Sequence, residues 1–360
     1  MTAARTTTDE HDTTNTSNLS ISRLIATHPR ERLFVHPLLW TTRHLSLLGC
    51  QFLDLGAITV VPLPLPSPQL VPAHRSTSNN NDGNDAITKA QYHLDASVAR
   101  RLATCRVPIT KGHALSRLLL RQQLICHGRQ VRFHYARRTV AQLPCCPFSR
   151  PRQSTCLPAA QLVYLDLSEI THHRTTKLKG QAPAPGGGGS RRINPPGSRR
   201  AQKLLQRLSP ADPCEDPYLV ALLIAMAQEQ RMDREVDCDS GKDEQRMDRE
   251  VDCDSGKDGG GGGGRGSSNT ARCPPPMLLL ATCPADTAWL HIYTSNLSAE
   301  FLDRLDHPSY PLPPAAVVPP ATIYRRRLAF EPYDTLPQRL AAVIVDARSD
   351  SVRISLPGAE

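Results

Sequence analysis

The residues best suited to chemistry in this sequence are arginines that stand beside aromatic side chains. The first cluster occupies the segment 129–138 and consists of Arg129, Arg132, Phe133, Tyr135, Arg137 and Arg138. A second cluster near the C-terminus consists of Arg325, Arg326 and Arg327. Guanidinium groups hold phosphates while rings stack on bases, so these residues are the predicted nucleic-acid contacts. The glycine-bearing aromatic motif of recognised RNA modules is missing, which leaves a solvated basic stretch as the favoured interpretation.

Enzymatic chemistry has a weaker basis in the sequence. The residues available for a catalytic site are His291, Tyr293 and Tyr333, together with the arginine triplet, and their more ordinary place is in a core or on a sheet surface. The sequence has neither a Gly-x-Ser-x-Gly elbow nor a His-Glu-x-x-His helix. A metal-dependent nuclease needs a lysine near its carboxylates, and residues 259–360 contain none. No catalytic residue is therefore predicted.

Metal and cofactor sites are not predicted either. The candidate zinc ligands Cys126, His127, His134, Cys145 and Cys146 match no tetrahedral spacing, which favours free thiols. The glycine run at 259–264 lacks the Lys-Ser/Thr of a phosphate-binding loop. The repeated DCDSGKD sequence lacks glycine at the sixth position of a calcium loop.

Charge is divided unevenly along the chain. Residues 97–210 hold 21 Lys or Arg side chains but only two acidic ones, Asp166 and Glu169. Residues 211–258 hold 6 basic and 15 acidic side chains. This contrast predicts either a polyanion-binding segment or attraction between neighbouring segments.

Cysteine usage and the N-terminal sequence bear on the compartment. There are 11 cysteines, an odd number, without any Cys-x-x-Cys pair, and no apolar signal segment opens the chain. We expect a protein that is cytoplasmic or nuclear and not secreted, with free thiols and no membrane partner. A protein or a nucleic acid remains the possible partner, and the sequence does not choose between them.

Composition predicts a single small core. Only 4% of residues are aromatic, and there are 32 prolines. We expect residues 1–96 to be mostly disordered, 97–180 to be a basic region of short elements, 181–210 to be a flexible linker and 347–360 to be a tail. The domain itself is placed at 211–346, interrupted by an insertion at 229–275. A Pro- and Arg-rich stretch poor in acids is also typical of translated non-coding DNA, so the coding status of residues 34–210 is open.

Inside the basic region three short elements are visible. Leu115, Leu118 and Leu119 recur at helical spacing, and Val131 and Phe133 alternate with polar neighbours as in a strand. A third element is expected at 161–170. Because Pro- and Ser-rich segments separate them, we do not expect these elements to form a domain.

The C-terminal region carries regular elements in close succession. Asp216 and Pro217 predict the start of a helix whose residues 218–227 are apolar on every face, which requires burial. The runs 277–282 and 288–294 predict a hairpin, Ser298 caps a helix, 322–330 predicts a strand, and Asp334 caps a helix containing Leu336 and Leu340. The order helix, strand, strand, helix, strand, helix predicts a small α+β layer.

An identical repeat interrupts this series. EQRMDREVDCDSGKD occupies 229–243 and again 244–258, directly before the glycine run. Functional repeats diverge and are longer, so this copy indicates recent slippage of DNA. Lengthening a loop costs little free energy, which makes the insertion tolerable.

Three segments resemble an uncharacterised protein family of filamentous ascomycete fungi: DPYLVALLIAMAQEQR, LHIYTSNLSAEFLDRLDHPS and YRRRLAFEPYDTLPQRL. The resemblance implies no activity or ligand. With the lack of catalytic motifs, it favours a non-enzymatic interaction module. An RNA- or DNA-associated protein is the alternative, and an enzyme of unrecognised type is the second alternative.

Overall fold

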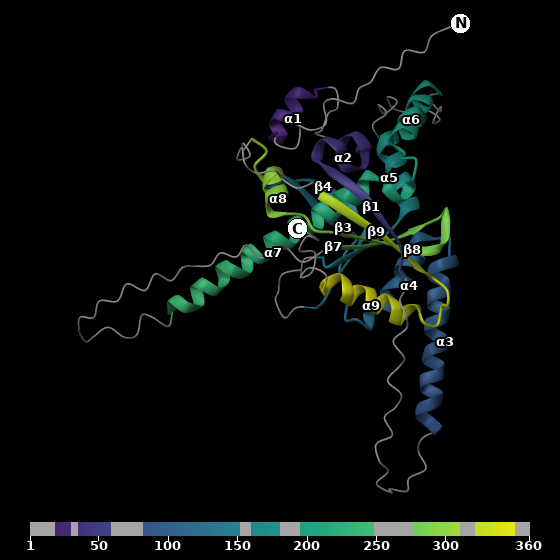
Figure 1. Ribbon diagram of the computed structural model, residues 1–360. Helices are drawn as coiled ribbons and strands as arrows, with labels where there is room; N and C mark the ends of the chain where they lie inside the picture. Colours follow the sequence, from purple (N-terminus) through teal and green to yellow (C-terminus); the bar gives the residue numbers. More distant parts are fainter. Residues whose placement is uncertain are drawn as a thin grey trace, which may run out of the picture.

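A computed structural model describes residues 19–29, 35–58, 82–151, 160–180, 195–247, 277–309 and 321–349. These residues build a mixed α+β structure around one seven-stranded sheet (Figure 1). In spatial order the strands are β1 (Cys50–Ala57), β9 (Ala321–Ala329), β8 (Asp286–Ser295), β7 (Met277–Cys283), β6 (Leu162–Asp166), β5 (Cys146–Ser149) and β2 (Ile125–Cys126). The pairs β1–β9 and β6–β7 are parallel, and the other pairs are antiparallel.

The centre of the sheet is apolar on both sides. Every residue of β6 and β7 is buried, and the two strands pair from Leu162↔Leu278 to Asp166↔Thr282. Continuous apolar runs are the expected sequence of strands covered on both faces. The sheet therefore forms the middle layer between two hydrophobic cores.

Helices cover both faces of the sheet. The first core takes residues from α1 (Ile21–Thr27), a 3₁₀ turn η1 (Pro37–Leu39), α2 (Thr42–Leu48), α5 (Leu167–Gly180), a second 3₁₀ turn η2 (Pro213–Glu215), α7 (Pro217–Met247), α8 (Ala299–Asp306) and a separate hairpin of β3 (Gln130–Tyr135) and β4 (Arg138–Pro144). The second core takes residues from α3 (Asp82–Thr104), α4 (Pro108–Leu120) and α9 (Leu336–Ser349). Helix α6 (Pro195–Leu208) packs on α5. None of the helices in the described ranges has the length and apolar content needed to cross a membrane.

Helix α7 is the central element of the first core. Each residue from Tyr218 to Ala227 has 0% exposure, which confirms that this apolar stretch must be buried. Its start is capped as predicted, since the Tyr218 backbone N–H donates to the Asp216 carboxylate at 2.9 Å. Further along, the Gln228 side chain accepts from the His134 backbone N–H and donates to its carbonyl, both at 2.9 Å. These two hydrogen bonds join the free edge of strand β3 to helix α7.

A buried ion pair connects α5 to the start of α7. The guanidinium of Arg174 contacts the two carboxylate oxygens of Asp216 at 2.6 and 2.8 Å and also donates to the Leu38 carbonyl at 2.7 Å. Arg174 is 1% exposed. A bidentate pair with a third hydrogen bond satisfies most of the donors of the buried guanidinium.

The predicted C-terminal series is confirmed in its order. Helix α7 is followed by β7, β8, α8, β9 and α9. Ser298 accepts from the Phe301 backbone N–H at 3.2 Å at the start of α8. Leu336 and Leu340 of α9 are buried in the second core.

The structure differs from the expectation that residues 211–346 form the domain alone. Strand β1 pairs with β9 from Cys50↔Ala321 onward, and β5 and β6 extend the sheet beyond β7. The elements at 35–58 and 97–180 therefore belong to the same fold. The low aromatic content wrongly predicted a single small core, because leucine side chains supply much of the buried surface.

Two further boundaries differ from the sequence-based expectation. Residues 195–208 of the expected linker form α6, and α7 continues to residue 247 through the first copy of the repeat. Most of the second copy, the glycine run, residues 1–18 and the end of the tail lie outside the described residues.

Candidate functional site: a basic groove over helix α4

The arginine-rich segment 129–138 forms the β3–β4 hairpin, which packs against α7. Phe133 is 4% exposed, and its ring meets that of Trp40 edge-on at a centroid distance of 5.5 Å. Tyr135 is half-buried, and burial raises its pKa to about 12. The ring of Phe133 is part of the core and is not free to stack on a base. Arg132, Arg137 and Arg138 remain on the surface, and Arg129 lies just before β3.

The hairpin turn explains how Arg137 reaches the surface. Ala136 and Arg137 have φ angles of 50° and 59°, the left-handed conformation. Such a two-residue turn matches the twist of the flanking strands. The Ala136 backbone N–H donates to the Leu305 carbonyl of α8 at 2.9 Å. This contact adds a further anchor for the turn.

The arginine triplet on β9 is divided between the two faces of the sheet. Arg325 contacts the carboxylates of Asp54 and Asp212, each at 2.5 Å. Arg326 points to the opposite face and lies 3.6 Å from the Asp346 carboxylate. On the first face, the Arg327 guanidinium carbon lies 5.8 Å from the centre of the Trp289 ring. The three cations do not form one phosphate site.

The residues considered for catalysis are divided in the same way. His291 and Tyr293 are opposite Arg327 and Arg325 in the β8–β9 register, on the first face. Tyr333 packs against the second core, with the Arg100 guanidinium carbon 5.4 Å from its ring centre. The sheet separates these two groups.

His291 instead lies beside Asp286 and Cys214, the latter distant from it in the sequence. Its Nε2 atom is 3.7 Å from the Cys214 Sγ and 3.4 Å from the Asp286 carboxylate. Burial lowers the pKa of His291, while the nearby Asp286 charge acts in the opposite direction. Within the described parts of the chain, no cluster of His, Cys, Asp and Glu side chains is arranged to hold a metal ion.

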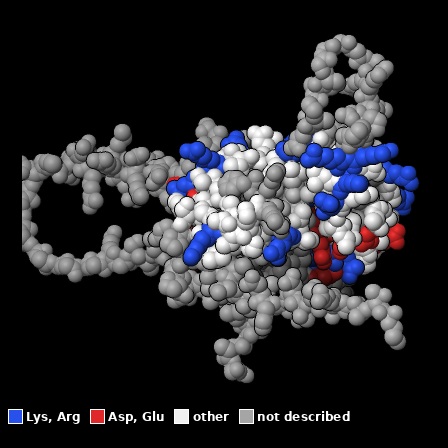
Figure 2. All heavy atoms as spheres, turned by 90° about the horizontal axis from the view of Figure 1, so that it is seen from above, with Lys and Arg blue, Asp and Glu red and all other residues white. Residues whose placement is uncertain are grey.

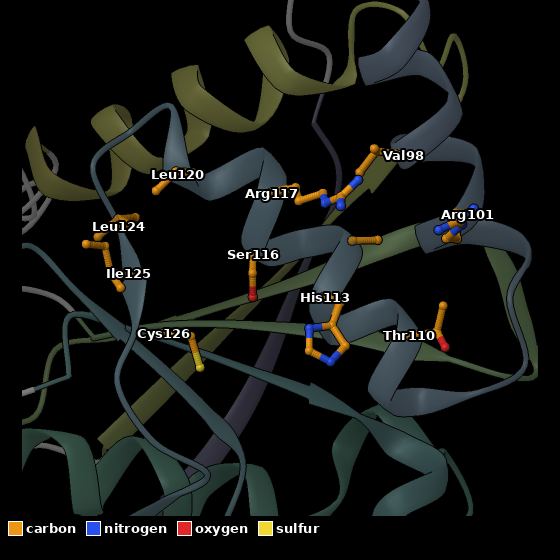
Figure 3. Close-up of a pocket in the computed structure, with 11 residues that line it drawn as sticks. Val98, Arg101, Thr110, His113, Ser116, Arg117, Leu120, Leu124, Ile125 and Cys126 are labelled. Carbon is orange, nitrogen blue, oxygen red and sulfur yellow. The ribbon is translucent and has the colours of Figure 1, made fainter.

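A surface groove with cationic and apolar walls lies over the exposed side of α4, and its volume is about 570 Å³. Its lining residues are Val98 and Arg101 of α3; Thr110, His113, Ala114, Ser116, Arg117 and Leu120 of α4; and Leu124, Ile125 and Cys126 at β2. We call this the α4 groove. Figure 3 shows the α4 side chains between those of α3 on one side and those of β2 on the other. None of the described lining residues is acidic, which distinguishes the groove from the paired arginines of β9.

A buried polar network fixes the underside of α4. The Lys111 ammonium donates to the Asp166 Oδ2 at 2.7 Å, and the Thr282 hydroxyl donates to the same oxygen at 2.8 Å. The Tyr164 hydroxyl lies 2.9 Å from the Thr282 hydroxyl oxygen. Lys111 and Asp166 are 5% and 1% exposed.

The network keeps the Asp166 carboxyl charged. Burial by itself raises the pKa of Asp166, but the hydrogen bonds from Lys111, from the Ser168 hydroxyl and from Thr282, together with the Lys111 charge, outweigh burial and hold that pKa below its ordinary value. The charged carboxylate in turn retains the Lys111 ammonium inside the protein. The result is an α4 whose position over β6 and β7 is set by a polar contact as well as by apolar packing.

The α4 groove contains a solvent-exposed thiol whose pKa is lowered. Cys126 lies at the edge strand β2 and is exposed. Its pKa is lowered, mainly because the Cys146 thiol hydrogen-bonds to it, with smaller contributions from a backbone hydrogen bond at Gly128 and from the positive charge of Arg129. A thiol whose pKa is lowered holds a larger share of thiolate at neutral pH, and thiolate is the nucleophilic form.

Sequence reasoning missed the groove although a signal was present. Thr110, His113 and Arg117 recur at i, i+3 and i+7 of the predicted helix, so they share its solvent side. Arg101 comes from a different helix and could not be added without the α3–α4 packing. Cys126 and Cys146 were considered only as metal ligands.

Comparisons with family models, curated proteins and solved structures found no match to this chain. The resemblance to a fungal family therefore stays a prediction.

Proposed function

We propose that this protein is a non-enzymatic binding module that holds a single strand of RNA or DNA in the α4 groove. The observation that supports the proposal best is the lining of the groove, where Arg101, Arg117 and His113 meet hydroxyl groups and no described acidic side chain. Arginine and hydroxyl groups are the usual protein partners of phosphate oxygens. The groove lies in the region where basic residues outnumber acidic ones by 21 to two.

An extended polyanion fits this protein better than a small anion. Figure 2 shows Lys and Arg side chains spread widely over one face, whereas Asp and Glu gather toward one side of it. A chain of phosphates can contact several cations in succession, whereas a single phosphate can contact only a few. The exposed apolar side chains of Leu120 and Ile125 offer a surface for bases. Because the described lining holds no aromatic ring, phosphate contacts should dominate affinity and sequence preference should be slight.

The decisive experiment is a fluorescence-anisotropy titration of the full chain with labelled single-stranded RNA and DNA over a salt series. For a single strand, each phosphate contact contributes about −0.7 to the slope of log K against log salt concentration. The double variant Arg101→Gln/Arg117→Gln should bind more weakly, and its slope should be shallower by about 1.4 because two contacts are lost.

Matched controls separate the groove from general surface charge. Arg23→Gln removes an exposed cation of α1, and Arg138→Gln removes one from the β3–β4 hairpin; both should keep the slope of the native protein. The proposal is wrong if the groove variant binds like the native protein, or if Arg138→Gln produces the larger loss.

A further inference from the structure

The two cysteine sulfurs beside the α4 groove lie on neighbouring strands and on the same face of the sheet. In the antiparallel β2–β5 pair, Cys126 is opposite Phe148, and in the β5–β6 pair, Cys146 is opposite Tyr164. Cys146 is two residues from Phe148 on β5, so both point toward α4, and Cys126 and Cys146 are diagonal neighbours. The Cys146 thiol is within hydrogen-bonding reach of the Cys126 sulfur.

The two sulfurs differ in their access to solvent. Cys126 is exposed and lines the groove, whereas Cys146 is half-buried beneath α4. The close approach of α4 is visible at Gly112, where an added Cβ would lie 3.5 Å from the Cys146 sulfur. A small oxidant from solvent therefore meets Cys126 first, and Cys146 is placed to react second.

We propose that Cys126 and Cys146 form a redox-active dithiol that closes to a disulfide on exposure to a peroxide. In the first step the Cys126 thiolate attacks one peroxide oxygen, the O–O bond breaks, and the products are the sulfenic acid of Cys126 and hydroxide, which takes up a proton. In the second step the Cys146 sulfur attacks the Cys126 sulfur, its proton passes to the departing oxygen, and water leaves as the S–S bond forms. Two electrons pass from the two thiols to one peroxide molecule.

The local structure permits the bond to close. A disulfide requires Cβ atoms about 3.5–4.5 Å apart, closer than diagonal neighbours usually lie. Strand β2 contains only two residues, pairs with β5 at two positions, and forms the edge of the sheet. A short edge strand can shift toward β5 without disturbing the central strands. Closure would draw Cys126 away from the groove wall.

Other described cysteines provide internal contrasts. Cys145 is adjacent to Cys146 in sequence but is buried in the first core, and burial raises its pKa well above the ordinary value. Cys214 and Cys283 also approach each other, but both are buried, with exposures of 6% and 3%. Cys105 is partly exposed and hydrogen-bonds to the Val107 backbone.

Peptide mapping by mass spectrometry tests the proposal on the full chain. The reduced protein is treated with hydrogen peroxide near stoichiometry, remaining thiols are alkylated, and tryptic peptides are analysed without reduction. We expect a linked pair joining the peptide of Cys126 to the peptide of Cys146, reversed by dithiothreitol. Fragmentation of the linked pair separates Cys145 from Cys146.

Two variants sharpen the result. Cys146→Ser should leave the Cys126 sulfenic acid without a partner, so that dimedone labels it, while Cys105→Ser should form the same linked pair as the native protein.

Rapid oxidation of the native protein without a Cys126–Cys146 link would overturn the proposal, as would alkylation of Cys126 no faster than that of Cys105 at pH 7. Both decisive readouts use the native protein, so they hold even if a variant fails to fold. The mass measurement requires no nucleic acid and is independent of the proposed function.

Discussion

Replacement of Lys111 by methionine should be among the most damaging single changes in this protein. The Lys111 ammonium is the cationic partner that hydrogen-bonds the Asp166 carboxylate, and both side chains are almost fully buried. Methionine fills a similar volume but leaves the carboxylate without its counter-charge. Removing one member of a buried pair costs about 3–5 kcal/mol, because the remaining charge stays desolvated. For a domain of this size the loss corresponds to a fall in melting temperature of about 6–20 °C.

The pH dependence provides a stricter test of the same reasoning. In the native protein the pKa of Asp166 is lower than in the unfolded chain. The Asp166 carboxylate therefore stabilises the fold above the unfolded-state pKa, and this stabilisation is lost as pH falls through the folded-state pKa. In Lys111→Met burial dominates and the Asp166 pKa rises, so the folded variant takes up a proton more readily than its unfolded chain. The difference in unfolding free energy should therefore be largest near neutral pH and should shrink as pH falls toward about 4.

Urea unfolding followed by circular dichroism measures both quantities. The double variant Lys111→Met/Asp166→Asn removes the isolated charge and should recover much of the loss. A cost below about 1 kcal/mol for Lys111→Met at neutral pH, or a cost that does not change with pH, would refute the assignment of a charged buried pair.

Three other predictions concern different parts of the molecule. Arg174→Met should lower the unfolding free energy by about 3–5 kcal/mol, because it leaves the Asp216 carboxyl buried without its partner, and urea unfolding checks this. Deleting residues 244–258 should change the unfolding free energy by less than about 0.6 kcal/mol, because it removes only the last four residues of α7 and shortens the segment between α7 and β7; thermal unfolding would expose a larger change. Cys146→Ala removes the main cause of the low Cys126 pKa, so the midpoint of iodoacetamide alkylation against pH should move upward toward the ordinary cysteine value, and an unchanged midpoint would contradict the hydrogen bond.

Local elements of the fold could be predicted from sequence because their signals are local. The all-apolar stretch 218–227 requires burial, and the alternation around Leu290 and Ile292 indicates a strand. Strand β1 gave no comparable signal, because its apolar residues Leu53 and Leu55 are exposed at the sheet edge. Its partner β9 lies far away in sequence, and nothing within either segment specifies that pairing.

The candidate site was predictable only in its chemistry. The excess of cations in residues 97–210 suggested a polyanion, but the side chains facing solvent could not be distinguished from those used internally. Lys111 and Arg174 are buried in ion pairs, and Phe133 is part of the core. The groove depends on how α3 and α4 pack, a long-range property that composition and periodicity do not encode.

Hydrogen–deuterium exchange of the full chain, with and without a saturating single-stranded oligonucleotide, tests the binding proposal most directly. The account predicts slower exchange in peptides covering residues 98–126 when the strand is bound, with little change in β9. Slower exchange confined to residues 130–138 or 325–327, with the α4 peptides unchanged, would contradict it.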